Sequence, residues 1–206
     1  EVKYVVANDD VASAPKAVKE QRHGIAGGFF MWKVGGARAA KGGSLDDVIA
    51  SAQNVVNRTK SICVGLEPCV IPALGHSNFK IEDGTMEFGV GHHGEAGTKV
   101  EKLKSASEMA QEMAETILND FDFEEGKEVA VMLSGLGATP VMELYVLYDE
   151  VEKVLAKAGH KVWKTYIGNY VTSLDMNGAS LTIVDLDDEI KELLSEPAVP
   201  IGMKNY

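Results

Sequence analysis

Residues 128–159, EVAVMLSGLGATPVMELYVLYDEVEKVLAKAG, contain in one stretch the pattern that decides the fold. The apolar run at residues 129–133 is typical of a strand covered on both faces. In the GLGATP turn that follows, Thr139 is placed to cap a helix and Pro140 to occupy its first turn. Apolar residues at helical spacing then continue to Gly159, a residue suited to end a helix. A strand, a tight turn and an amphipathic helix in succession predict an α/β fold.

The same alternation of strand and helix patterns extends in both directions from this stretch. Ser44 and Asp47 form a capping box at one helix start. Ser105 and Glu108 form another. We expect strands at residues 2–7, 61–66, 86–90, 162–167 and 181–186, helices at residues 25–41, 44–58, 105–121 and 187–195, and an irregular connection at residues 67–85. This order predicts one complete α/β domain from about Ser44 onward, with part of another before it.

The composition is that of an ordinary globular protein. Of 206 residues, 45% are hydrophobic and 25% are charged, and 20 Lys and Arg against 31 Asp and Glu give a net charge of −11. A field of that sign repels phosphate backbones, so we expect no nucleic-acid partner. The longest apolar run, residues 25–32, is far shorter than the roughly 20 residues of a membrane span, so we expect no membrane insertion.

The two cysteines, Cys63 and Cys69, bear on the redox compartment. They lie six residues apart in a chain without a secretory pattern, which favours buried free thiols in a reducing cytoplasm over a disulfide. Their spacing is also not that of a zinc site. Because the sequence starts without Met, directly in strand-like residues, we expect it to be a fragment or a processed chain.

Two glycine-bearing turns are candidates for chemistry. GLGATP lacks the third glycine of a dinucleotide fingerprint and the G-K-[ST] of a phosphate loop, so we interpret it as a fold-forming turn. GVGHHGEAG, residues 89–97, follows a strand and sets His92, His93 and Glu95 among glycines that let a ligand approach the backbone. A histidine there could bind metal, transfer protons or attack a carbonyl. On residue types alone, these roles and that of a structural turn histidine stay open.

The orientation of the two histidines narrows these roles. Neighbouring side chains on an extended strand point to opposite faces, so one of His92 and His93 is expected to face a cleft and the other to face away. A metal ion shared by the two is therefore not expected. A Ser-His-Asp hydrolase is not supported either, since the chain has no G-x-S-x-G motif.

Six blocks of the chain together resemble a known family. They are VANDDVA at residues 6–12, RHGIAGGFFMWKVGGARAAKG at 22–42, VGLEPCVIPALG at 64–75, MEFGVGHHGEAG at 86–97, SGLGATPVMELY at 134–145 and GNYVTSLDMNGASLTIVDLDDE at 168–189. In this order they are similar to the C-terminal portion of the dihydroxyacetone-binding subunit of dihydroxyacetone (glycerone) kinase. The resemblance covers nearly the whole chain.

The resemblance implies a fold and a site. The fold is a mixed-sheet α/β one with two domains, shared with DegV-like fatty-acid-binding proteins. Residues 1–43 then correspond to the remainder of the N-terminal substrate domain, and residues 44–206 to the C-terminal domain that carries the substrate-binding histidine. The family's H-G-E-P-G motif matches residues 93–97, so His93 is implied as the nucleophile that binds dihydroxyacetone as a covalent hemiaminal. Gly94 beside it leaves room for the substrate.

Departures from the family pattern limit what is carried over. Ala96 replaces the proline of the motif, and His92 stands where an aliphatic residue is usual. The family's G-G-G-S-G-H-E segment and a further substrate-activating aspartate have no counterpart in the sequence, so Asp9 and Asp10 are interpreted as loop-capping residues. No cofactor and no metal is expected on this chain, since the resemblance implies ATP or ADP with Mg on a partner domain or subunit.

The implied function is capture of dihydroxyacetone for phosphoryl transfer to dihydroxyacetone phosphate. The resemblance implies a cytoplasmic homodimer that works with a nucleotide-binding kinase subunit or domain, and the 206-residue chain alone is expected to be inactive. The alternative is a non-catalytic, dihydroxyacetone-binding regulatory paralogue that acts as a transcriptional coactivator. A lipid-binding DegV-like protein is disfavoured by the match around GHHGEAG.

Overall fold

One mixed sheet organises the molecule. The computed structural model describes residues 1–77, 79–93, 95–122, 126–201 and 203. Over these residues the strand order is β3-β2-β1-β6-β4-β5, in which β4 and β5 run parallel and the other neighbours antiparallel. The strands are β1 (Thr59–Glu67), β2 (Thr85–Phe88), β3 (Lys99–Lys102), β4 (Glu128–Gly135), β5 (Lys161–Gly168) and β6 (Asn177–Asp185). The predicted mixed-sheet α/β class is confirmed.

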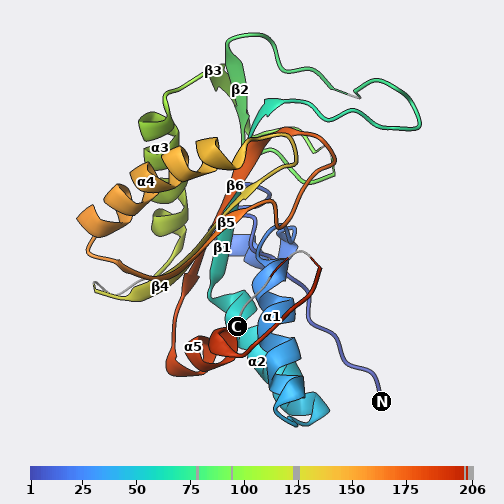
Figure 1. Cartoon of the computed structure of the whole chain (residues 1–206), viewed down its shortest axis with the longest axis vertical. Helices are drawn as coiled ribbons and strands as arrows, with labels where there is room; N and C mark the ends of the chain where they lie inside the picture. The colour runs from blue at the N-terminus through green and yellow to red at the C-terminus, as the bar shows by residue number, and fades with distance from the viewer. Residues whose placement is uncertain (78, 94, 123–125, 202, 204–206) are drawn as a thin grey trace.

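Helices cover both faces of this sheet (Figure 1). On one face α3 (Ala106–Asp120) and α4 (Val141–Lys157) pack together, and on the other α1 (Gly28–Ala40) packs with α2 (Leu45–Asn57) and α5 (Asp188–Ser195). A short 3-10 helix, η1 (Lys16–Gln21), precedes α1. The division that we predicted after residue 43 falls between α1 and α2 and stays a prediction.

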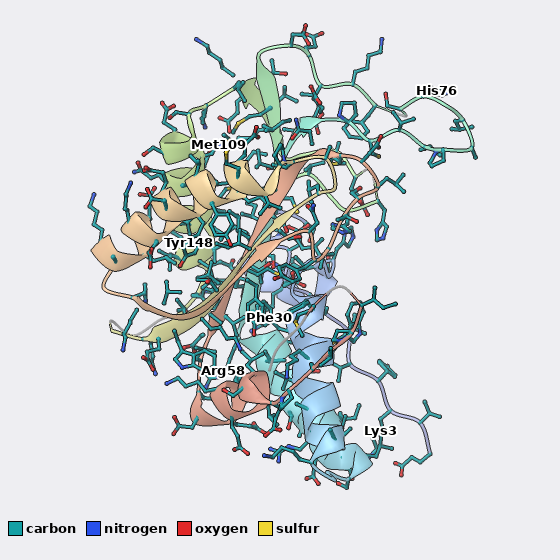
Figure 2. All side chains as sticks on the ribbon, viewed as in Figure 1. Lys3, Phe30, Arg58, His76, Met109 and Tyr148 are labelled. Atoms are coloured by element: carbon teal, nitrogen blue, oxygen red, sulfur yellow. The ribbon has the colours of Figure 1, made fainter. Side chains whose placement is uncertain are left out.

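Strand β4 demonstrates the two-sided burial that its sequence predicted. Val129, Val131 and Leu133 point into the core beneath α3 and α4. Ala130 and Met132 point into the core beneath α1 and α5, where Phe30 is also fully buried. Figure 2 labels Phe30 on the α1 side, and Met109 and Tyr148 on the α3 and α4 side. An apolar run without alternation is therefore the correct pattern for a strand with helices on both faces.

Local sequence sets the helix ends as predicted. The Ser44 and Asp47 capping box opens α2, and the Ser105 and Glu108 box opens α3, with both reciprocal hydrogen bonds present in each. Gly159 follows Ala158, the C-cap residue of α4, and has a φ of +82°. That left-handed conformation is typical of the glycine that ends a helix.

Three expectations about individual elements were wrong. Residues 2–7 form no strand, because no ladder pairs their backbone with a neighbour; the bridge between Asp10 and Ser61 is isolated. Thr139 does not cap α4; its hydroxyl bonds instead to Asn177 and to the carbonyl of Gly178. The third error is the omission of β3, which is four residues long, polar and largely exposed, and therefore lacks a hydrophobic pattern.

Within the described ranges, none of the helices combines the length and apolarity that crossing a membrane requires.

Candidate functional site

The loop that follows β2 is fixed by backbone bonds to its neighbours. The N–H of Gly89 donates to the carbonyl of Cys63 (2.7 Å), and the N–H of Thr98 donates to that of Phe88 (2.8 Å). Gly89 has a φ of +75°, and a Cβ built there would lie 2.7 Å from the Cβ of Ala12. Glycine is required at this position both for the turn and for the close approach. The histidine segment thus projects from a rigid base.

His93 is presented outward beside a carboxylate. Its side chain is 82% exposed, and its Nδ1 lies 3.6 Å from Oε1 of Glu95. The N–H of His93 donates to the other oxygen, Oε2, at 2.7 Å. Partial burial acts to raise the pKa of Glu95, but backbone hydrogen bonds and the neighbouring imidazoles outweigh it and lower that pKa overall. An ionised Glu95 therefore stands beside the Nδ1 edge of the His93 ring.

His92 is turned inward and differs chemically from its neighbour. Both of its ring nitrogens are buried and have no hydrogen-bond partner in the described structure. Burial lowers the pKa of His92, the adjacent His93 lowers it further, and the Thr172 backbone opposes the shift. The hydroxyl of Ser173 donates to the His92 carbonyl at 2.7 Å and ties the loop to the segment before β6. His92 is therefore a neutral, shielded imidazole.

The prediction that only one of the two histidines faces a cleft was wrong, although His92 is turned inward and His93 outward. They line one cavity of about 370 Å³, together with Cys69, Ile71 and residues 172–174. Their ring centroids are 6.0 Å apart and the ring planes are inclined by 80°. The strand periodicity fails because residues 92 and 93 lie in a turn and not in extended backbone. The predicted substrate contact Gly94 lies outside the described residues.

The N-terminal segment supplies site residues that sequence reasoning missed. Nδ1 of His23 lies 4.0 Å from Oε1 of Glu95, so this carboxylate stands between two imidazoles. Nothing in local spacing pairs His23 with the loop, since the contact joins segments far apart in the chain. Burial raises the pKa of Asp10 to about 6, an effect that Asp9 reinforces and nearby positive and N–H groups oppose.

Asp9 and Asp10 have the structural roles that we predicted. Asp9 is 1% exposed, and its carboxylate accepts the N–H groups of Ile25 (3.1 Å) and Gly27 (2.7 Å) at the start of α1. Asp10 accepts the N–H of Ala12 at 3.0 Å, which closes a tight turn. These bonds hold the segment that bears His23 against the sheet.

The other candidate chemistries find no support in the described part of the chain. No group of three or more His, Cys, Asp or Glu side chains there is arranged to hold a metal ion. Cys63 and Cys69 are free and buried as predicted, and burial raises the pKa of Cys63 well above its usual value. In the GLGATP turn, the N–H groups of Leu136 and Ala138 donate to backbone carbonyls next to β6 and are not available to a phosphate.

Fold and site together define a mixed-sheet α/β domain with a small cavity that is lined by a histidine turn at the end of the central strands. The chain belongs to the Dak1 domain family, whose pattern matches residues 1–201. This match confirms the resemblance that the sequence blocks indicated.

Two relatives within this comparison match more than nine-tenths of the chain. The chain is 39% identical over 188 residues to the dihydroxyacetone-binding subunit DhaK of a PTS-dependent dihydroxyacetone kinase 1 from Listeria innocua, covering 91% of this chain and 57% of that protein. It is 36% identical over 198 residues to a D-erythrulose kinase from Mycolicibacterium smegmatis, covering 96% of this chain and 34% of that protein. The chain thus spans little more than half of the first relative.

Solved structures of other proteins have the same fold as this chain. A dihydroxyacetone kinase operon co-activator, Dha-DhaQ, superposes with a TM-score of 0.87 at 29% identity, covering 94% of this chain and 60% of that one. A fatty-acid-binding protein from Thermotoga maritima, TM841, superposes with a TM-score of 0.50 at 12% identity over 74% of this chain and 52% of that one. The latter is a likeness of fold alone.

Proposed function

We propose that this chain is the substrate-binding part of a dihydroxyacetone kinase and that His93 captures the ketone covalently. The observation that carries the proposal is an exposed imidazole at the rim of a ligand-sized cavity, with an ionised carboxylate 3.6 Å from its Nδ1. His92 lines the same cavity, but both of its ring nitrogens are buried, so we assign the nucleophile to the exposed His93. The family membership supplies the substrate class, a short hydroxyketone.

The capture step follows from the positions of these groups. Nε2 of His93 donates its lone pair to the carbonyl carbon, the C=O π bond becomes a C–O single bond, and the oxygen takes up a proton. The ring becomes a cation as the bond forms, and its Nδ1 proton passes to the Glu95 carboxylate and on to solvent; this balances the proton that the oxygen takes up from solvent and leaves a neutral, alkylated imidazole. The product is a hemiaminal in which no atom is lost from ketone or protein. Glu95 acts by stabilising the positive ring as the bond forms.

Covalent capture also explains how such a site selects its substrate. Glycerol presents nearly the same hydroxyl groups as dihydroxyacetone but has no electrophilic carbon. Hydrogen bonds to hydroxyls alone would separate the two poorly, whereas a bond to the carbonyl excludes glycerol altogether. Because burial lowers the pKa of His92, we expect that ring to stay neutral. It then adds no second positive charge beside His93 that would weaken the attraction between His93 and Glu95.

Phosphoryl transfer requires parts beyond these residues. We propose that ATP or ADP with Mg is held by a nucleotide-binding domain or subunit that docks near the captured ketone, and that this partner neutralises charge on the moving phosphoryl group. The working assembly is a cytoplasmic homodimer of the substrate-binding subunit with that partner.

A second candidate function is a regulator that binds dihydroxyacetone without phosphorylating it. The observation in its favour is the close superposition on the co-activator Dha-DhaQ. The two functions share the capture step and differ in transfer. Adding a nucleotide-binding kinase subunit and ATP with Mg to the intact protein separates them, because the kinase then forms dihydroxyacetone phosphate and the regulator does not.

The capture step is tested by NMR with dihydroxyacetone labelled with carbon-13 at the carbonyl. We expect the ketone signal to convert to that of a tetrahedral carbon on addition of the protein. His93→Ala should abolish this conversion, and His92→Ala should largely preserve it. His76→Ala is the matched control, since that histidine lies on the β1–β2 connection (Figure 2) and does not line the cavity.

Two outcomes would refute the proposal. Conversion that survives in His93→Ala would exclude this residue as the nucleophile. Loss in His92→Ala alone would assign the bond to the other histidine. Circular dichroism of each variant establishes that the fold is intact, so that loss of the signal reports on chemistry.

A further inference from the structure

A second cavity, lined mainly by polar residues, lies at the opposite end of β1 from the histidines. Its volume is about 430 Å³, within the range of small-molecule sites. It is bordered by η1, by the ends of α2 and α3, by the first residues of β1 and by the end of β6, and its lining residues are Lys16, Lys19, Asn54, Asn57, Arg58, Lys60, Asp120, Phe121, Asp122 and Asp185. Arg58, labelled in Figure 2, marks its position between α2 and the sheet.

Lys60 is the unusual residue of this cavity. It is 7% exposed, yet its ammonium has no hydrogen bond or salt bridge in the described structure and contacts the ring of Phe121 at 5.9 Å from the centroid. Burial lowers the pKa of Lys60, and Asp120 opposes that shift. A lysine side chain confined to this degree, with no ion pair of its own, is best stabilised by a nearby anion.

The acidic residues of the cavity do not supply that anion. Asp122 pairs with Lys16 at 2.7 Å, and Asp120 forms a two-bond pair with Arg22 at 2.6 and 2.7 Å. Asp185 pairs with Arg58 at 2.5 Å. Each carboxylate is therefore already matched to another cation.

A positive excess remains after these pairs are formed. Lys19 is exposed and has no side-chain ion pair among the described residues, so it is a second uncommitted ammonium, besides Lys60, that lines the cavity. The chain as a whole carries a net charge of −11. A local concentration of free positive charge is thus contrary to the overall charge and favours an anionic ligand.

An unpaired acceptor completes the pattern. Oδ1 of Asp185 is buried and has no hydrogen-bond partner in the described structure, while Oδ2 is occupied by Arg58. A ligand that satisfied Lys60 alone would leave this oxygen unpaired. A hydroxyl group donates to such an oxygen without bringing in a second charge.

We propose that this cavity binds a small phosphate monoester that carries hydroxyl groups. The phosphate oxygens pair with Lys60 and Lys19, and a hydroxyl donates to Oδ1 of Asp185. A phosphate suits two ammonium groups that line one cavity because it offers several acceptor oxygens and up to two negative charges. The site lies at the start of β1, whereas the histidine cavity lies beyond its end, and it does not depend on the proposed ketone capture.

Isothermal titration of the full chain with glycerol 3-phosphate tests the proposal, with inorganic phosphate and glycerol as separate arms. We expect millimolar or tighter binding of glycerol 3-phosphate, weaker binding of phosphate and none of glycerol. Lys60→Met should weaken glycerol 3-phosphate binding by about tenfold or more, since it removes a charge-assisted hydrogen bond. Lys102→Met is the matched control, because this exposed lysine on β3 lies outside the cavity.

The design separates failure of folding from failure of the site. Lys60→Met removes an unpaired charge from a largely buried side chain, so its Tm should equal or exceed that of the parent chain, and Lys60→Gln provides a second variant. Unchanged affinity in both variants, or no binding of glycerol 3-phosphate at all, overturns the proposal. Equal affinity for inorganic phosphate and glycerol 3-phosphate overturns the role given to Asp185.

Discussion

The buried ion pair between Arg22 and Asp120 should be a main support of the N-terminal segment. The Arg22 side chain is 1% exposed and that of Asp120 is 11% exposed. Two parallel hydrogen bonds of 2.6 and 2.7 Å join them, and Nε of Arg22 donates to the carbonyl of Ala14 at 2.7 Å. The pair therefore fastens the segment that bears Asp9, Asp10 and His23 to the end of α3.

Removing one partner leaves the other charge buried and uncompensated. We expect Asp120→Ala to lower the free energy of unfolding by about 3 to 5 kcal/mol, the range measured when buried pairs are broken. For a chain of this length, that loss corresponds to a fall in Tm of about 10 °C. Arg22→Met combined with Asp120→Leu should cost less than Asp120→Ala alone, because neither charge is then left unpaired.

The pH dependence of this loss has a definite sign. Burial acts to raise the pKa of Asp120, but the hydrogen bonds and charge of Arg22 outweigh it, and the pKa is lowered overall. A lowered carboxyl pKa stabilises the fold above the unfolded-state pKa of about 4, and the contribution is lost as pH falls through the folded-state value. The difference between the parent chain and Asp120→Ala should therefore shrink in acid.

Thermal unfolding followed by circular dichroism, with chemical denaturation at neutral and acidic pH, measures these quantities. Asp149→Ala is the control, since its partner Lys153 is 60% exposed and such surface pairs contribute well under 1 kcal/mol. If Asp120→Ala and Asp149→Ala destabilise the chain equally, or if the Asp120→Ala loss does not change with pH, the assigned role of the buried pair is wrong.

Three further predictions concern the turn before α4, catalysis and assembly. Gly137→Ala should destabilise the chain by about 3 kcal/mol or more in chemical denaturation. The reason is that Gly137 has a φ of +135° and that a Cβ there would lie 2.0 Å from the carbonyl oxygen of Leu174. For comparison, Ser105→Ala removes a helix cap and should cost only about 1 kcal/mol. The isolated 206-residue chain should not phosphorylate dihydroxyacetone with ATP and Mg, and turnover above a protein-free control would contradict this. The intact subunit should be a homodimer by light scattering, since Trp32 remains 71% exposed on α1; a monodisperse monomer at high concentration would count against it.

Local chemistry in the sequence was sufficient to predict most elements. The capping boxes at Ser44 and Ser105 act within one helical turn, and the left-handed Gly159 follows from the lack of a Cβ. The apolar run in β4 required helices on both sides, which fixed the α/β class. Each of these features depends on residues close together in the chain. The predicted strand at residues 2–7 failed because a strand also depends on a distant partner.

The candidate site depends on tertiary structure much more than the individual helices and strands do. The sequence singled out GHHGEAG, and with the family resemblance it singled out His93, but the strand rule gave the wrong relation between His92 and His93 because the backbone turns there. The approach of His23 to Glu95 and the unpaired ammonium of Lys60 depend on which segments the folded chain brings together. Charge pairing and burial are properties of distances through space, and periodicity along the chain does not contain those distances.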